Sequence, residues 1–284
     1  MKLSEREKQE LKNVEKWEKE FIEKKENGFL AKVNKFFSNS FSKAADKIVP
    51  KKSNKIFHKV LAAVETAIAG CMDAGQDIVK FTYDKNKAVK KFKKRGIKSL
   101  DDLYKIDVME LDKLSRRVVL SNKITGFIEG FAFGLGNITA AIADIPVFFS
   151  LTFRVMQQIA ANYGYDPEDS REKLFMVKLM SFGTAIKSSG KLTIQAELQT
   201  LKVGIKRYTF KKLQEMGGRY SVVITARSIG KNVGLRLTKK TLLKGIPILG
   251  GAFGGFFNYG FIKNMADITN MMYKKRFLED KIEK

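Results

Sequence analysis

Two glycine-rich apolar segments, Ile124–Phe153 and Gly245–Ile262, constrain the fold of this chain more than any other feature. Glu129 and Asp144 interrupt the first segment, so its longest charge-free run is shorter than the about 18–20 residues that a spanning helix needs. The second segment carries no charge and reaches the lower limit for a span, but Pro247 and two glycine pairs favour a turn. We expect both segments to form helical hairpins packed in the core, with a re-entrant hairpin or a single span as the alternatives for the second.

The glycines of these segments are spaced so that helices can approach one another closely. Repeats at intervals of four place small residues on one helix face, as in a glycine zipper. The residues to which we assign this packing role are Gly126, Gly130, Gly134, Gly250, Gly251, Gly254 and Gly255. Between the segments, Gly164 fits the C-terminus of one helix, while Asp166 and Pro167 fit the N-cap and first position of the next.

Most of the remaining chain has the periodicity of amphipathic helices. Apolar residues at helical spacing predict a helix over residues 1 to about 26 and a first core helix over residues 54–82. A hydrophobic content of 44% with only four prolines is typical of a globular helical protein. The predicted fold class is all-α, a multi-helix bundle in which residues 1–50 form an amphipathic basic extension and residues 51–284 form one helical domain.

The net charge of +24 points to a polyanionic partner. Basic stretches adjoin the apolar segments, and residues 29–41 place phenylalanines on one side of an amphipathic stretch, as in helices at an anionic membrane surface. Packing of that stretch on the protein's own core is the alternative. Nonspecific binding to nucleic acid is less favoured, because no reading helix or aromatic sheet face accompanies the charge. The candidate lipid-binding residues are Lys87, Lys90, Lys91, Lys93, Lys94, Arg95, Arg236, Lys239, Lys240, Lys244, Phe36, Phe37 and Phe41.

The chain lacks the residues that most catalytic and metal sites require. Its one histidine, His58, and its one cysteine, Cys71, lie thirteen residues apart, which is about 20 Å along a helix. They cannot form a catalytic dyad or a usual zinc site there, so we expect no metal, no cofactor and no internal disulfide. One cysteine fits a reducing compartment, and the N-terminus has no apolar core of the kind found in signal peptides, so we expect a cytoplasmic protein.

Glu129 and Asp144 form the one constellation that could carry chemistry. If the first apolar segment folds back near its middle, the two carboxylates face each other in apolar surroundings, as in sites for acid–base catalysis. A lipid- or acyl-handling hydrolase is therefore the alternative function. The structural interpretation is favoured, in which Asp144 caps the helix that carries Pro146 and a basic neighbour balances Glu129.

Four stretches carry a resemblance to a known family. They are MELDKLSRRVV, AIADIPVFFSLTFRVMQQIAANYGYDPEDSREKLF, LRLTKKTLLKGIPILGGAFGGFFNYGFIKNMAD and RFLED, which together extend from about Ser99 to Asp280. These stretches resemble the EcsC protein family. The resemblance implies an all-helical protein and a link to a membrane transporter, because the bacterial family is named for a gene beside the two subunits of an ABC transport system. It supplies no catalytic residues. We therefore expect a protein that binds anionic lipid at the inner face of the cell membrane, as an accessory to such a system and without catalysis.

Overall fold

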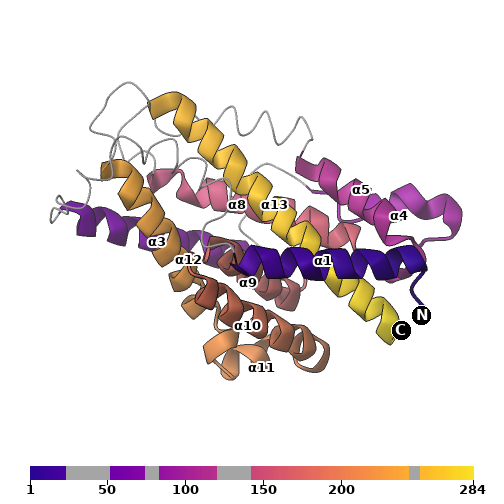
Figure 1. Cartoon of the computed structure of the whole chain (residues 1–284). Coiled ribbons are helices and arrows are strands. Elements are labelled where there is room, and N and C mark those ends of the chain that lie inside the picture. The colour runs from indigo at the N-terminus through magenta and orange to yellow at the C-terminus, as the bar shows by residue number, and fades with distance from the viewer. Residues whose placement is uncertain (24–51, 74–82, 120–141, 243–249) are drawn as a thin grey trace.

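The computed structural model describes residues 1–23, 52–73, 83–119, 142–242 and 250–284; the side chains of residues 52–56, 119, 236–242 and 250–259 lie outside this description. Every regular element in these ranges is a helix, which confirms the predicted all-α bundle (Figure 1). In chain order the elements are α1 (Glu5–Glu23), α3 (Lys52–Met72), α4 (Lys87–Phe92), η1 (Lys93–Arg95), η2 (Asp101–Lys105), α5 (Val108–Val119), α8 (Ile145–Asn162), α9 (Ser170–Thr184), α10 (Ser188–Arg207), α11 (Phe210–Glu215), η3 (Gly218–Tyr220), α12 (Val222–Leu242) and α13 (Gly250–Glu283).

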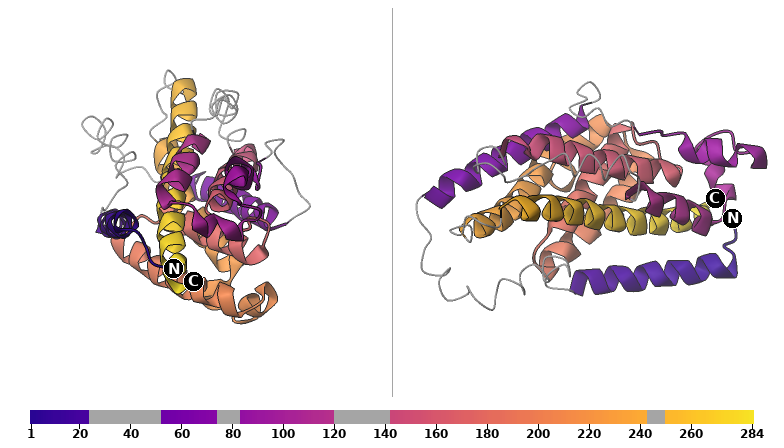
Figure 2. Two further views of the ribbon diagram at one scale, coloured as in Figure 1. Left: turned by 90° about the vertical axis from the view of Figure 1, so that its right-hand side faces the viewer. Right: turned by 90° about the horizontal axis from the view of Figure 1, so that it is seen from above.

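Helix α13 is the axis of the bundle. It is 34 residues long, and most of its residues from Gly260 onward are buried. Helices α1, α5, α8 and α9 pack against it, and views at right angles show α1 on the outside of the bundle (Figure 2). Helix α8 runs in the same direction as α13, because Phe149 contacts Phe261 and, farther along both helices, Tyr163 contacts Phe277. A helix enclosed on several sides needs buried residues around most of its circumference, which α13 supplies.

Helix α1 confirms the helix predicted at the N-terminus. It begins with a capping box: Ser4 Oγ accepts a hydrogen bond from the Glu7 backbone N–H, and the Glu7 carboxylate accepts one from the Ser4 backbone N–H. Its apolar stripe, including Val14, Phe21 and Ile22, is buried against the bundle. A charged helix that would be marginal alone is therefore stabilised by tertiary packing.

Glycines bring helices close together in the described parts of the chain, but at positions other than those predicted. The first core helix, α3, ends at Met72, earlier than expected, and packs antiparallel to α12. A methyl group added to Gly230 would lie 2.6 Å from Leu61 Cδ1, and one added to Gly234 would lie 3.0 Å from the Phe57 ring. These two helices touch where α12 has no side chains to hold them apart.

The hairpin turn expected at the glycine pairs of the second apolar segment is absent. Gly250, Gly251, Gly254 and Gly255 all lie within α13, which is continuous from Gly250 onward. Glycine inside a helix costs only about 1 kcal/mol relative to alanine, which is too little to end a helix whose later turns are so extensively buried. The first segment lies outside the described residues up to position 141, including Gly126, Gly130 and Gly134, and then enters α8. In the part of the chain that is described, no helix is both long and apolar enough to span a membrane.

The residues that end α8 and begin α9 are partly those predicted. Gly164 follows α8 with a φ of 89°, the left-handed conformation expected after a helix. The predicted N-cap is wrong: Asp166 accepts a hydrogen bond from the Glu168 backbone N–H in a turn, and Asp169 caps α9 by accepting one from the Arg171 backbone N–H. Pro167 therefore belongs to that turn rather than to the first position of the helix. Asp169, three positions after Asp166, is an equally good N-cap residue by type, so the local sequence could not show which of the two caps the helix.

We expect replacement of Gly164 by alanine to lower the free energy of unfolding by about 1–3 kcal/mol, because a side chain is strained at this φ. The added methyl group would also lie 2.8 Å from the Leu100 carbonyl oxygen. Gly190→Ala is the matched control, since its added methyl group meets nothing within 4 Å. Urea unfolding of both variants measures the difference, and an equal effect at the two positions would contradict the strain argument.

Candidate functional site: a buried ion-pair network and a basic surface

The last half of α13 carries charged side chains that are buried rather than exposed to solvent. Lys274, Lys275, Arg276, Asp280 and Lys281 all have this property. Their partners come from α1, α5, α9 and α10, which surround α13 on different sides. Charges are seldom buried unless they are paired, so this network determines how the surrounding helices fit together.

Arg276 and Glu172 form the innermost pair. Two parallel bonds join them, with Arg276 Nη1 2.8 Å from Glu172 Oε2 and Nη2 2.6 Å from Oε1. Tyr273 donates its hydroxyl to the same carboxylate at 3.2 Å, and the guanidinium stacks on Tyr165 at 4.2 Å from the ring centroid. Burial lowers the pKa of Arg276, but the charge of Glu172, its hydrogen bonds and the neighbouring Tyr165 and Tyr273 together outweigh burial and raise the pKa above its usual value. The pair therefore joins α9 and α13 inside the bundle.

Asp112 of α5 is a second centre of the network. Its Oδ1 accepts a hydrogen bond from Asn270 at 2.6 Å and lies 3.1 Å from Lys274 Nζ, while its Oδ2 lies 2.9 Å from Arg116 Nε. Tyr163 at the end of α8 donates to Asn270 at 2.9 Å. Burial alone would raise the pKa of Asp112, but the Asn270 hydrogen bond and the two cations outweigh it and lower the pKa. Three helices thus converge on one ionised carboxylate.

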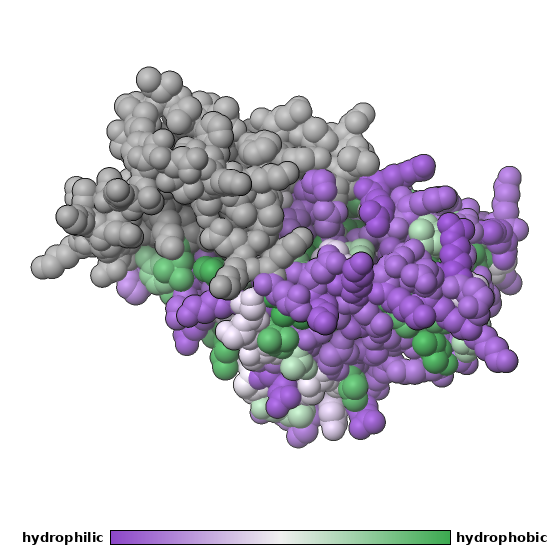
Figure 3. Space-filling view, in the orientation of Figure 1, coloured by the Kyte–Doolittle hydropathy of each residue, from purple (hydrophilic) through white to green (hydrophobic). Residues whose placement is uncertain are grey.

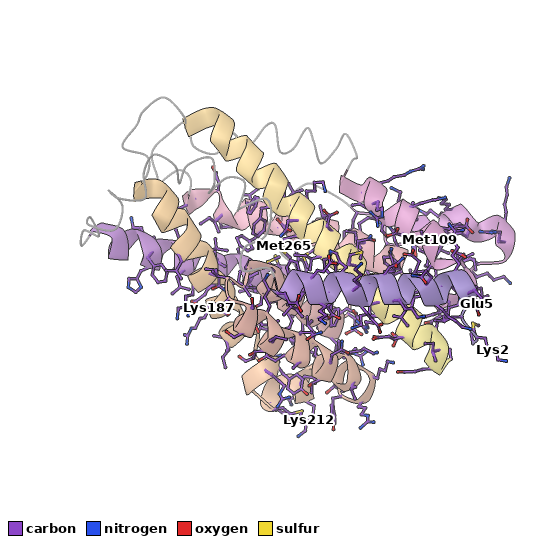
Figure 4. The ribbon with its side chains drawn as sticks, in the orientation of Figure 1. Lys2, Glu5, Met109, Lys187, Lys212 and Met265 are labelled. Atoms are coloured by element: carbon purple, nitrogen blue, oxygen red, sulfur yellow. The ribbon has the colours of Figure 1, made fainter. Side chains whose placement is uncertain are left out.

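Helix α1 joins the network through three glutamates on its inner face. Glu7 lies 2.7 Å from Lys281, Glu10 lies 3.2 Å from Lys274, and Glu18 lies 2.5 Å from Lys275. Burial would raise the pKa of Glu7, yet the Lys281 hydrogen bond and the Ser4 cap lower it overall. The basic residues of α1 are instead on its exposed face: Arg6, Lys8, Lys12, Lys16 and Lys19. Figure 4 shows Glu5, at the start of α1, at the end of the molecule where the chain termini lie.

This arrangement suits positioning rather than reaction. Its carboxylates are paired with cations inside the bundle, and Cys71 is also buried, which raises the pKa of its thiol to about 12. In the described ranges, no group of three or more His, Cys, Asp or Glu side chains is placed to hold a metal ion. His58 and Cys71 both lie on α3, as predicted, far from each other along the helix.

The basic run that was predicted to bind lipid forms an exposed end of the bundle. Lys87, Lys90 and Lys91 lie on α4, and Lys93, Lys94 and Arg95 follow in η1. The run is not without acidic neighbours, because Lys90 lies 2.9 Å from Asp84 and Arg95 lies 2.8 Å from Glu110. The run itself contains no acid: Asp84 lies three residues before it, and Glu110 belongs to α5. Phe92 is buried beneath the cations and anchors the run to the bundle.

The other predicted lipid-binding residues are described only in part. Helix α12 includes Arg236, Lys239 and Lys240, but only their backbone is described. The structure does not describe Lys244, Phe36, Phe37 or Phe41. Figure 1 shows α4 at one end of the elongated bundle and the last turns of α12 near the other, so the structure does not bring the two basic stretches together.

Of the two candidate catalytic carboxylates, only Asp144 is described. It occupies the N-cap position of α8, with proline in the first turn as expected, but its side chain makes no capping hydrogen bond. Its backbone carbonyl accepts from the Phe148 N–H at 3.0 Å. Glu129 lies outside the described residues, so their pairing stays a prediction.

Sequence reasoning did not find the buried network, although it singled out the stretches that contain it. Asp112 lies in MELDKL, Glu172 in DSREKLF and Arg276 in RFLED. These stretches are far apart in the chain and meet only around α13. The available signal was the cluster of charges at positions 274–281, directly after an apolar stretch, on a helix with no obvious polar face.

Comparison with known proteins agrees with the resemblance seen in these stretches. The model of the EcsC protein family matches residues 8–278, which extends from within α1 to α13. The uncharacterized protein YdbA of Bacillus subtilis (strain 168) is 26% identical over 242 residues, covering 85% of this chain and 82% of the relative. Protein EcsC of the same organism is 21% identical over 244 residues, covering 84% of this chain and 88% of the relative. No solved structure matches the chain.

Proposed function

The chain belongs to the EcsC protein family, and from this premise we propose that it is a peripheral or monotopic membrane protein that binds anionic lipid and has no catalytic activity. It acts at the inner face of the cell membrane, where anionic lipids give the surface a negative potential. The role as an accessory to a transport system is part of the same proposal and rests on the resemblance alone.

The distribution of charge carries this proposal. The chain has 54 basic and 30 acidic residues, and buried carboxylates such as Glu18, Asp112 and Glu172 already have cationic partners inside the bundle. The excess of cations must therefore be borne largely by the surface. A lysine or arginine held near an anionic leaflet contributes about 1 kcal/mol of attraction.

The exposed lysines of α4 and η1 are the best-described part of that surface. Lys87, Lys91, Lys93 and Lys94 are exposed, and no carboxylate in the described ranges lies within ion-pair distance of them. We call these four residues the α4 lysine cluster. Burial of Ala88 and Phe92 packs this short helix against the bundle, so the backbone that carries the cations is held in place.

We expect replacement of all four cluster lysines by glutamate to weaken binding to anionic vesicles on the order of 1,000-fold, since each lysine near the surface contributes about 1 kcal/mol and about 1.4 kcal/mol is a factor of ten. Flotation with vesicles of phosphatidylcholine, with and without phosphatidylserine, measures the effect. The charge-matched control replaces Lys2, Lys12, Lys16 and Lys19, which are also exposed, by glutamate. A wild-type protein that floats with neither vesicle would refute the proposed function, and equal losses in both variants would show that net charge rather than the cluster matters.

A further inference from the structure

Large apolar side chains are exposed at one corner of the bundle, where α10 ends, α11 follows and α12 begins. We call residues 203–224 the α11 corner. These 22 residues carry five of the nine large hydrophobic residues that are exposed in the described ranges, so the exposure is concentrated rather than scattered. The exposed fractions are 45% for Val203, 39% for Tyr208, 48% for Met216, 58% for Val223 and 55% for Ile224.

The corner is held in shape by contacts on its inner side. Leu213 and Tyr220 are buried, and a methyl group added to Gly204 of α10 would lie 3.1 Å from the Leu213 side chain. Gln214 bridges the turn: its Nε2 donates to the Tyr220 carbonyl at 2.7 Å, and its Oε1 accepts from the Val222 backbone N–H at 3.4 Å. These contacts hold in place the backbone that carries the exposed apolar residues.

Cations surround this apolar surface. Arg207, Lys211, Lys212 and Arg219 are all exposed, and Glu215 is the one acidic residue in the corner, 3.5 Å from Lys212. Arg219 donates to Thr200 at 3.4 Å, which places its guanidinium one helical turn from Val203. Figure 4 shows Lys212 at the lower edge of the bundle, and Figure 3 shows hydrophobic patches interrupting the hydrophilic surface along that edge.

The combination of apolar and cationic residues identifies the partner. Apolar side chains among lysines and arginines suit the boundary between headgroups and acyl chains of an anionic bilayer, where the cations meet phosphates and the apolar groups leave water. Protein–protein interfaces are by contrast depleted in lysine. The α4 lysine cluster differs in chemistry, because none of the large apolar residues that are exposed in the described ranges lies in α4 or η1.

We propose that the α11 corner inserts Tyr208, Met216, Val223 and Ile224 shallowly into an anionic bilayer. This inference rests on the proposed function and adds a second contact of a different kind. The α4 lysine cluster supplies attraction that salt screens, whereas the α11 corner supplies apolar contact that salt does not remove.

A label at the corner tests insertion directly. Cys71 is buried with a raised thiol pKa, so an environment-sensitive fluorophore reacts selectively with a cysteine introduced by Met216→Cys. We expect a blue shift on addition of phosphatidylserine vesicles and none with phosphatidylcholine alone. Leu192→Cys, at an exposed apolar residue outside the corner, is the control and should show no shift.

A second measurement tests the energetic role. The triple variant Met216→Ser, Val223→Ser and Ile224→Ser should lose on the order of tenfold in affinity for anionic vesicles at high salt. The control triple Leu192→Ser, Leu235→Ser and Ile282→Ser, at other exposed residues, should bind normally.

If the wild type binds vesicles while the label at position 216 stays in water, the corner proposal is wrong and the proposed function stands. If the corner triple instead dissociates a dimer without affecting vesicle binding, the partner is a second copy and the proposal is wrong. Absence of binding to either vesicle refutes both.

Discussion

Truncation of Glu172 to alanine is expected to lower the free energy of unfolding by about 3–5 kcal/mol, the range for breaking a buried ion pair by removing one partner. Arg276 would keep its charge in a buried setting, with only the distant Asp280 at 3.7 Å as a carboxylate partner in the described network. Tyr273 would also lose the carboxylate to which its hydroxyl donates. The cost comes from the uncompensated guanidinium rather than from the lost volume. Chemical denaturation in urea measures it.

A double substitution separates charge from packing in this test. Glu172→Leu combined with Arg276→Met removes both charges, and it should restore much of the stability lost in either single variant. Glu215→Ala, which removes one partner of an exposed pair with Lys212, is the control and should cost no more than about 1 kcal/mol. A loss below about 1 kcal/mol for Glu172→Ala would contradict the role assigned to the pair.

Replacement of Asp112 by asparagine is the second large effect that we expect, at about 3 kcal/mol near neutral pH, because the variant leaves Lys274 without one of its two carboxylate partners. The loss should depend on pH. The folded-state pKa of Asp112 is lowered, so its stabilisation is present above the unfolded pKa of about 3.9 and disappears as the pH falls through the lower folded value.

The difference between wild type and Asp112→Asn should therefore be largest at neutral pH and shrink on acidification below about pH 4. Unfolding free energies measured from pH 7 to pH 3 test this trend. Asp267→Asn is the matched control. Asp267 and Lys263, both on α13, form an exposed ion pair that should contribute little to stability at any pH. A difference between wild type and Asp112→Asn that stays constant down to pH 3 would show that Asp112 acts through packing and not through its charge.

Local patterns predicted much of the secondary structure. The helix at the N-terminus follows from apolar spacing and became α1, and Gly164 marks the end of α8 as expected. Asp107 lies directly before α5 and accepts a hydrogen bond from the Met109 backbone N–H, as an N-cap residue does. Each of these signals involves residues within a few positions of one another, so the sequence alone displays all the interacting groups.

The same reasoning was wrong where local preference competed with distant contacts. The glycine pairs at positions 250–255 favour a turn locally, yet α13 continues through them because its later turns are enclosed by other helices. Likewise, Glu110 of α5 pairs with Arg95 at the end of the lysine-rich run, which itself contains no acid. Neither outcome follows from a window of neighbouring residues.

The sequence by itself determined that the chain is all-helical, strongly cationic and without the residues of a usual zinc site or His–Cys dyad, because periodicity and composition depend on the residues alone. Only the tertiary structure decided which charges are exposed. Glu7 and Lys281 are 274 positions apart and form a buried ion pair, while lysines near Glu7 on α1 are exposed to solvent. Because a charge can be buried only where a partner and hydrogen bonds compensate its lost hydration, the assignment of each charge to the interior or the surface depends on how distant helices pack.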